Sequence, residues 1–470
     1  MQKTKNLKRD SWSKVLNWLF LLGGIAIFLY TFYRAEVTFN GERADTYTKY
    51  YVISLTLISF YALALRAKNE IRLSIVMISI SVVSVIYLVE ISIAIVLSSG
   101  ELIDRDTRTI FQVYSDLVDE GFDPVPSIRP TNFVSSNGVL SKDNKRLYPL
   151  GGVSKRTTIY CNESGERVIY KSDKYGFRNT SQAWNLKDKV WVVIGDSFAH
   201  GACVKDGEHS AARVQSLKPG YSIINLGIGG SGPLIELAIL KEYAVSLKPE
   251  VIMWFYFEGN DLVQNLDYEL TSSLLKNYLR PTYTQKLLIR QDEIDKTLMS
   301  YVESIIKQKQ SGIVSRLETL VQSSRILRLL NLRRFVGIDN KVWDPEVERL
   351  IVPGEFMAIL KQAQAAALQW GGEIYFVYVP EYSRYLLENK NDLTFRSRGQ
   401  VLDLVSSLGI PVIDIHKEVF ENHSDSLSLF PRRSEPHYTP EGYKLMGDAL
   451  VNGIEKNQLA IDVIRKATTQ

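Results

Sequence analysis

A serine at the point where a strand meets a helix is the feature of this chain with the clearest chemical meaning. Residues 191–201, WVVIGDSFAHG, form an apolar, strand-like run that ends in Gly195-Asp196-Ser197 and leads directly into a helix start. Such a turn lifts the serine hydroxyl clear of a sheet and puts its backbone N–H at the positive end of a helix. A nucleophile that develops an oxyanion beside itself needs this position. Taken alone the motif is weak, since glycine, aspartate and serine are also ordinary turn residues.

Three further segments carry residue types that suit the same chemistry. Residues 221–232, YSIINLGIGGSG, are a second strand that opens into a glycine-rich turn. Residues 250–261, EVIMWFYFEGND, are a third strand, and residues 434–443, SEPHYTPEGY, end in a helix-start signature. Each segment offers one candidate at a strand end or before a helix: Gly230, Asn260 and His437.

Serine, glycine, asparagine and histidine in this chain order resemble the SGNH (GDSL-type) hydrolase superfamily, over roughly residues 165–455 apart from a long insertion. The resemblance implies acyl transfer through a serine ester, with Ser197 as nucleophile and His437 as the base that removes its proton. It also implies an oxyanion hole made of the backbone N–H groups of Ser197 and Gly230 and the side-chain amide of Asn260. The alternatives are a turn glycine at 230, a helix cap at 260–261 and a surface loop histidine at 437.

The chain departs from the superfamily at the third member of the expected triad. The family usually places aspartate three residues before the histidine, and Ser434 stands at that position here. Glu435 lies two residues before His437 and is our candidate for orienting the imidazole. A backbone carbonyl or no partner at all are the alternatives, because a serine–histidine dyad is workable. Glu258 also stands where the family often has glycine.

Two more side chains are candidates for contact with substrate. Asp196 directly precedes the serine, and Arg178 lies in VIYKSDKYGFRNT (168–180), which resembles the segment that often precedes the first strand in this superfamily. A structural salt bridge is the alternative role for Arg178. We assign no metal ligand and no cofactor.

From residue 189 onward, strand-like runs alternate with helical patterns. Strands are predicted at 190–194, 221–225, 250–257, 373–379 and 411–415, and helices at Pro233–Leu247, Glu355–Trp370 and Arg398–Leu408. This alternation predicts an α/β fold with a doubly wound parallel sheet, whose sites form outside the carboxyl ends of the strands. We expect an SGNH-hydrolase-like domain over 189–460 with a helical insertion at 262–352.

Part of that insertion, residues 312–337, is amphipathic and basic, with arginines among leucines at helical spacing. It suits a lid or wall of a substrate groove, or a segment resting on anionic headgroups. A helical hairpin packed on the sheet, with its arginine face in water, is the alternative.

Apolar residues concentrate near the N-terminus. Stretches at 15–33, 50–65 and 73–97 predict three transmembrane helices within a membrane region over 1–99, since a bilayer core needs about 20 helical residues. Three buried core helices are the alternative. Lys and Arg gather before the first stretch and in the second loop, which puts these segments in the cytoplasm and everything after Leu97 outside it. Glu90, inside the third stretch, is costly in lipid unless paired.

Residues 100–188 are polar and turn-rich, and we expect them to form β-hairpins that pack on the catalytic domain. Both cysteines of the chain, Cys161 and Cys203, lie on the oxidising side if this topology holds. We therefore predict a disulfide between them. Two unpaired, buried thiols are the alternative.

These observations together predict an enzyme of the cell (inner) membrane with its catalytic domain in the periplasm or cell exterior. We expect it to handle O-acyl, foremost acetyl, esters on a carbohydrate. A transferase would need a multi-span acyl-exporting membrane protein as partner, with Glu90 as a candidate contact. A net charge of +4 and the absence of zinc-finger or aromatic–basic patterns argue against nucleic acid. The alternative function is a non-catalytic membrane component of a surface-polysaccharide assembly that keeps the fold.

Overall fold

The computed structural model describes most of the chain, namely residues 2–38, 44–98, 106, 108–140, 146–310, 326, 329, 332–333, 352–385, 395–433 and 435–468. It divides into two compact units. One comprises residues 1–100 with 325–336, and the other comprises residues 101–324 with 337–470. Each unit is described by itself.

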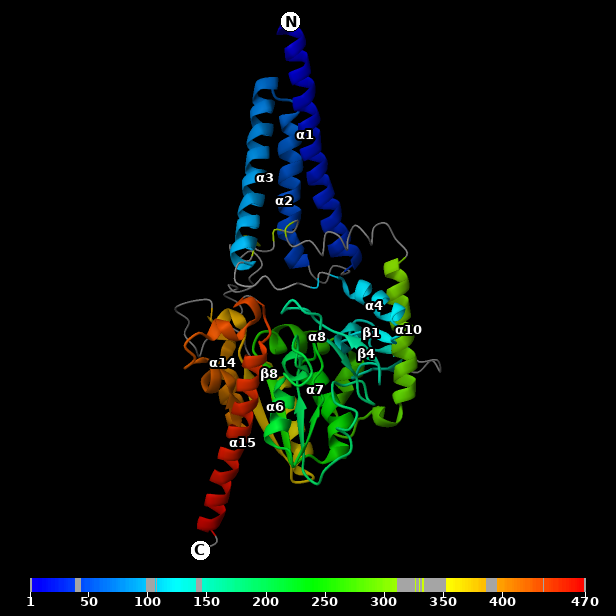
Figure 1. Cartoon of the computed structure of the whole chain (residues 1–470), viewed down its shortest axis with the longest axis vertical. Helices are drawn as coiled ribbons and strands as arrows, with labels where there is room; N and C mark the ends of the chain where they lie inside the picture. The colour runs from blue at the N-terminus through cyan, green and yellow to red at the C-terminus, as the bar shows by residue number, and fades with distance from the viewer. Residues whose placement is uncertain are drawn as a thin grey trace. The chain divides into compact units, whose positions relative to one another are not determined.

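A parallel sheet of five strands forms the centre of the larger unit (Figure 1). The strand order is β10-β9-β8-β6-β7, and every neighbouring pair is parallel. All five strands coincide with the predicted ones to within a residue at each end, because each is a short, almost continuous apolar run. They are β6 (Val190–Ile194), β7 (Ser222–Asn225), β8 (Val251–Phe257), β9 (Glu373–Val379) and β10 (Val412–Asp414).

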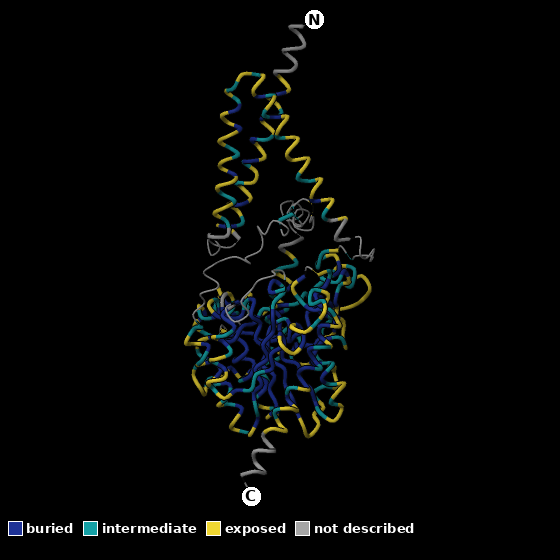
Figure 2. Tube along the Cα trace, turned by 90° about the vertical axis from the view of Figure 1, so that its left-hand side faces the viewer, coloured by how far each residue is buried: buried dark blue, intermediate teal, exposed yellow. Residues whose placement is uncertain are grey.

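Helices cover both faces of this sheet, so the predicted doubly wound α/β fold is confirmed. Successive side chains of a strand point to opposite faces: Ile252 and Trp254 enter one hydrophobic core, and Met253 and Phe255 enter the other. The first core is closed by α7 (Pro233–Ile239), α13 (Gly354–Leu368) and α14 (Arg398–Ser407). The second is closed by α6 (Ser210–Leu217) and α15 (Pro440–Thr468). The buried part of the trace in Figure 2 follows these layers.

A smaller sheet precedes the five strands of the large sheet in the chain. It has the order β1-β4-β5, from β1 (Pro124–Pro126), β4 (Thr157–Ile159) and β5 (Ile169–Lys171). Strands β4 and β5 are antiparallel, as are β2 (Val139–Leu140) and β3 (Arg146–Leu147), so the predicted hairpins are present. The pairing of β1 with β4 is parallel and was not predicted. Helix α4 (Ile110–Asp119) begins with a capping box of Thr109 and Gln112.

The insertion is helical where the structure describes it. It contains η5 (Asp261–Leu266), α8 (Asp267–Glu269), α9 (Ser273–Lys276), η6 (Asn277–Leu279), η7 (Leu287–Ile289) and α10 (Gln291–Gln310), where η denotes a 3-10 or π-helical segment. The predicted amphipathic stretch 312–337 lies outside the described residues except at 326, 329 and 332–333. The remaining short elements are η2 (Pro130–Phe133), α5 (Ser197–His200), η3 (Leu240–Ala244), η4 (Val245–Leu247), η10 (Tyr382–Tyr385), η11 (Phe395–Ser397), η12 (His416–Phe420), η13 (Ser426–Leu429) and η14 (Pro431–Arg433).

The smaller unit contains α1 (Gln2–Phe32), η1 (Tyr33–Thr38), α2 (Ala44–Ala64) and α3 (Asn69–Ser98). Two of its helical stretches, Ser11–Val37 and Asn69–Ile93, are long and apolar enough to cross a membrane. Helix α2, which contains the predicted second span at 50–65, is not one of them. Only 22% and 11% of the apolar windows in the two stretches are buried. Much of the trace of these helices is coloured as exposed in Figure 2.

Polar side chains join the helices of this unit. The Asn17 amide donates to the Tyr61 carbonyl at 2.8 Å, and Arg72 donates to the Ser13 hydroxyl at 3.1 Å. The Glu90 carboxylate is buried and accepts a hydrogen bond of 2.6 Å from the backbone N–H of Leu332. A residue of the chain's own insertion therefore supplies one hydrogen-bond partner for Glu90.

Candidate active site

The turn that carries Ser197 is built around a glycine and an aspartate. Gly195 has a φ of 153°, and a Cβ there would stand 2.7 Å from the Phe255 Cβ, so no other residue fits between β6 and β8. Asp196 is the N-cap of α5 and accepts a hydrogen bond of 2.9 Å from the Phe198 N–H. Ser197 is thereby the first residue of α5, half-exposed at the carboxyl end of β6.

His437 reaches Ser197 from the loop before α15. Its Nε2 lies 2.9 Å from the Ser197 Oγ, whereas the Asp196 carboxylate is 3.3 Å from that oxygen. The Phe198 ring packs beside the imidazole with centroids 5.1 Å apart. The next residue, Tyr438, is fully buried and donates to the Pro380 carbonyl. The two residues expected to form the dyad are thus in hydrogen-bonding contact.

The carboxylate beside the His437 ring belongs to Glu163, which corrects the assignment of Glu435. The Glu163 Oε1 lies 2.7 Å from Nδ1, and its Oε2 accepts from the His437 backbone N–H at 3.3 Å. Both ring nitrogens therefore have partners other than Glu435. Because an ionised carboxylate only accepts, Nδ1 carries the proton and Nε2 is left to accept the Ser197 hydroxyl proton. Ser434 lies outside the described residues.

Sequence reasoning missed Glu163 because it is 274 residues from His437, in the turn between β4 and β5, and just before the segment of superfamily resemblance. One feature of the sequence did indicate the turn that contains Glu163. Cys161 stands two residues before it, and the predicted disulfide to Cys203 already brought this turn to the nucleophile helix.

Hydrogen bonds tie the two expected oxyanion-hole segments to the nucleophile turn. The Ser231 hydroxyl and the Ile228 N–H both donate to the Gly195 carbonyl at 3.1 Å. Asn265 donates to the Ser231 carbonyl and to the Asn260 Oδ1, each at 3.0 Å. The second bond leaves the Asn260 amide N–H groups as the donors that face away from Asn265. The role of Asn260 as an oxyanion-hole donor stays a prediction.

Gly230, the other expected donor, lies in the turn that these bonds hold. Its φ is 79°, a left-handed conformation that favours glycine. A Cβ at this position would stand 3.1 Å from the Arg129 Cδ and 3.2 Å from the Thr131 Oγ1. The backbone conformation therefore favours glycine here, and the space beside it is tight.

His200 braces the same turn, a role that the sequence analysis did not assign. Its Nδ1 accepts a hydrogen bond of 3.1 Å from the N–H of Gly229, the residue before Gly230. Its Nε2 lies 2.9 Å from the Tyr170 hydroxyl, and the Tyr160 ring stacks on the imidazole at 4.4 Å. Burial holds the pKa of His200 well below its usual value, with the positive charge of Arg178 acting in the same direction. The ring therefore stays neutral and keeps Nδ1 as an acceptor.

Glu269, from the insertion, holds the other end of the glycine turn. Its carboxylate accepts from the backbone N–H groups of Gly232 at 2.5 Å, Leu234 at 2.9 Å and Ile235 at 3.2 Å. These N–H groups are the unpaired donors of the first turn of α7. Burial raises the pKa of Glu269 to about 8. The insertion is therefore part of the scaffold of the site.

The structure corrects the assignment of Arg178 and Asp196 as substrate contacts, because both are buried. Arg178 is 2% exposed, pairs with Asp206 at 2.8 Å and donates to the carbonyls of Gly201 and Val204. Asp196 is 1% exposed and is occupied as the cap of α5, and burial raises its pKa. The structural salt bridge weighed as the alternative for Arg178 is the one observed.

Cys161 and Cys203 form a disulfide with Cα atoms 5.2 Å apart. Potential ligand atoms of Glu163, Cys203 and His437 lie within 4.8 Å of one another, the one such group among the described residues. The Cys203 sulfur is bonded to Cys161 and has no thiolate to offer a cation. This cluster is therefore unsuited to a metal.

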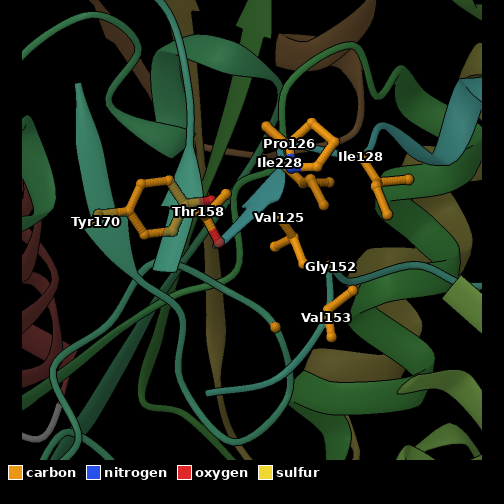
Figure 3. A pocket seen from close by; sticks show the side chains of 10 residues that line it. Val125, Pro126, Ile128, Gly152, Val153, Thr158, Tyr170 and Ile228 are labelled. Carbon is orange, nitrogen blue, oxygen red and sulfur yellow. The ribbon is translucent and has the colours of Figure 1, made fainter. Parts of the chain in front are cut away.

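A small cavity lies behind the glycine turn, between Ile228 and the small sheet (Figure 3). Val125, Thr158 and Tyr170 are among the residues that line it. Ser197 and His437 do not line it, so it is separate from the reacting groups.

No protein-family profile matches the chain, and no curated protein matches its sequence. Solved structures do match it. A putative lipolytic protein of the G-D-S-L family from Desulfitobacterium hafniense is 15% identical, covering 57% of this chain and 99% of its own, with a TM-score of 0.30. The lipase/acylhydrolase from Enterococcus faecalis is 12% identical, covering 57% and 96%, with a TM-score of 0.31. A catalytic mutant of Axe2, an acetylxylan esterase from Geobacillus stearothermophilus, is 12% identical, covering 57% and 94%, with a TM-score of 0.30.

Proposed function

We propose that this chain is a membrane-anchored ester-processing enzyme of the SGNH type, which transfers acyl groups through Ser197 outside the cytoplasm. The observation that carries the proposal is the continuous set of contacts from Glu163 through both nitrogens of His437 to the Ser197 hydroxyl. Nucleophile, base and orienting acid stand in the arrangement that activates a serine hydroxyl.

In the first half-reaction, the Ser197 Oγ attacks the ester carbonyl carbon while its proton passes to His437 Nε2. The carbonyl electron pair moves to the oxygen, which the amide of Asn260 and the backbone N–H groups of Ser197 and Gly230 stabilise. Collapse of this intermediate breaks the bond to the leaving alkoxide, which takes the proton from His437. In the second half-reaction, water or a sugar hydroxyl gives its proton to His437 and attacks the acyl–Ser197 ester. Ser197 then recovers the proton.

The proposed substrate is an O-acyl, foremost O-acetyl, ester of a carbohydrate at the cell surface. Two observations support a location at the membrane with the site outside. The apolar windows of α1 and α3 are mostly exposed within the chain, and a lipid bilayer would cover them. A disulfide beside the site persists in an oxidising compartment and is rare in the cytosol. A site in that compartment meets glycans and lipids, both of which carry O-acyl esters, and we propose the glycan.

Hydrolase and transferase can be separated with the full chain purified in detergent. The chain should hydrolyse p-nitrophenyl acetate, and Ser197→Ala should not. An acetylated oligosaccharide is then incubated with and without an unmodified acceptor oligosaccharide. Free acetate that forms at an equal rate in both samples indicates a hydrolase, and acetylated acceptor indicates a transferase. Absence of turnover on every ester would contradict the proposal and favour a non-catalytic role in polysaccharide assembly.

A further inference from the structure

The carboxylate of the triad is carried by a turn outside the parallel sheet. Glu163 lies between β4 and β5, whose backbone pairing ends with hydrogen bonds between Tyr160, Cys161 and Val168. Ser197 instead follows β6, a strand of the large sheet. His437 precedes α15, which packs on that sheet. The distance between Glu163 and His437 therefore depends on what fastens this turn to the catalytic domain.

Cys203 offers the turn a firm anchor. It lies six residues after Ser197, is 2% exposed and has a left-handed φ of 63°, a conformation that persists only where the surroundings hold it. Arg178 supplies that hold. It donates to the carbonyls of Gly201 and Val204, on either side of Cys203, and pairs with Asp206. The loop after α5 is thus held in place by hydrogen bonds from the buried Arg178 side chain.

The disulfide joins this anchor to Cys161, two residues before Glu163. A noncovalent link runs parallel to it, the ion pair of Lys205 and Glu166, but its side chains are 64% and 56% exposed. An ion pair in such contact with water holds two segments weakly. The covalent bond is therefore stronger than this ion pair. The contacts of Tyr160 and Tyr170 with His200 also join the hairpin to the catalytic domain, but the disulfide is attached two residues from Glu163.

We propose that the Cys161–Cys203 disulfide is a positioning element of the active site, which holds the Glu163 carboxylate against His437. The inference rests on the proposed function, since it assigns the bond a part in the activation of Ser197. Without the bond, Glu163 leaves Nδ1 for part of the time, and the imidazole loses its fixed tautomer and orientation. A misplacement of about 1 Å can lower a rate by about 100-fold, so we expect kcat to fall by about 10- to 100-fold.

A double-mutant cycle tests the proposal on the full chain in detergent. The variants are Cys161→Ser/Cys203→Ser, Glu163→Gln and the combination of all three substitutions. If the disulfide acts through Glu163, its removal lowers kcat when Glu163 is present and has no further effect together with Glu163→Gln. Equal loss in both backgrounds would overturn the proposal, because the bond would then support the fold in general. So would a double-serine variant that keeps the wild-type kcat.

Two controls separate this result from unfolding and from failure of the proposed function. Rates are measured well below the melting temperature of each variant, and Glu166→Gln, in the same turn, should keep the wild-type rate. The proton on Nδ1 of His437 is followed by NMR of protein with 15N-labelled histidine, assigned with His437→Ala. Its low-field resonance should weaken in the double-serine variant even if no ester is hydrolysed. An unchanged resonance would refute the positioning role independently of activity.

Discussion

Replacement of Glu163 by glutamine removes a negative charge beside His437 and leaves the size of the side chain almost unchanged. When His437 takes the Ser197 proton it becomes an imidazolium, with the Glu163 Oε1 2.7 Å from Nδ1. Two unit charges at this distance attract by about 6 kcal/mol at an effective dielectric constant of about 20. The His437 and Glu163 side chains are 18% and 17% exposed, so water screens part of this attraction. About 4 to 5 kcal/mol of attraction remains. We therefore expect kcat/KM to fall by about 10³- to 10⁴-fold.

The assay is hydrolysis of p-nitrophenyl acetate by the purified chain, with melting temperatures measured in parallel. Glu435→Gln is the matched control, because it removes a carboxylate two residues from His437 that touches neither of the paired ring nitrogens. It should keep kcat/KM within about threefold of wild type, in the range of a substitution outside the site. A Glu435→Gln variant as impaired as Glu163→Gln, or a Glu163→Gln variant above one tenth of the wild-type rate, would refute the assignment.

Three further predictions concern the oxyanion side, acid stability and topology. Asn265→Ala should lower kcat by about 10-fold or more with little change in KM, since it frees the Asn260 amide; equal changes in both parameters would contradict this. His209 caps α6 while buried, and burial lowers its pKa to about 3, so the unfolded chain binds a proton below pH 6.5 that the folded chain does not. The His209 contribution to the free energy of unfolding should therefore drop by about 2 kcal/mol from pH 7.5 to pH 5. In urea titrations His209→Asn should lose about 2 kcal/mol less than wild type over this range, while buried His200 keeps its own share of the loss in both proteins. A reporter active only outside the cytoplasm should work when fused after Gly100 and fail at Lys68; the reverse pattern would put the site inside the cell.

The fold could be predicted because the sequence patterns that mark its strands and helices each lie within a single element. Each strand of the large sheet is a run such as Val251–Phe257, buried along its whole length, and apolar residues without polar interruption mark such strands. Ser197, Gly230 and Asn260 follow these strands and were placed at the same edge by topology alone. The helix start after His437 located the base in the same way.

The third member of the triad, the carboxylate of Glu163, could not be found from local sequence patterns. Glu163 meets His437 through the packing of a separate hairpin, and apart from the predicted disulfide of Cys161 no residue around either one indicates that approach. Glu435 was preferred because it is close in sequence, yet distance along the chain does not tell where a side chain points. His200 escaped notice for a related reason, since its role depends on the Gly229 N–H and the Tyr170 hydroxyl meeting its ring.

Burial accounts for the misassigned charges. Arg178 and Asp196 are charged residues near the nucleophile, and sequence favours such side chains at the surface. In the fold they lie inside, where Arg178 clamps the loop of Cys203 and Asp196 caps α5. Both are buried and serve the geometry of the site.

Covalent labelling of Ser197 tests the central claim most directly. An alkyl fluorophosphonate forms a phosphorus–oxygen bond with an activated serine hydroxyl and releases fluoride. After reduction and trypsin digestion, the peptide Val190–Lys205 should carry the phosphonyl mass on Ser197. The same peptide from His437→Ala should remain unmodified, because the hydroxyl then has no base. An unlabelled Ser197 in the wild-type chain, or equal labelling in the His437→Ala variant, would contradict the account.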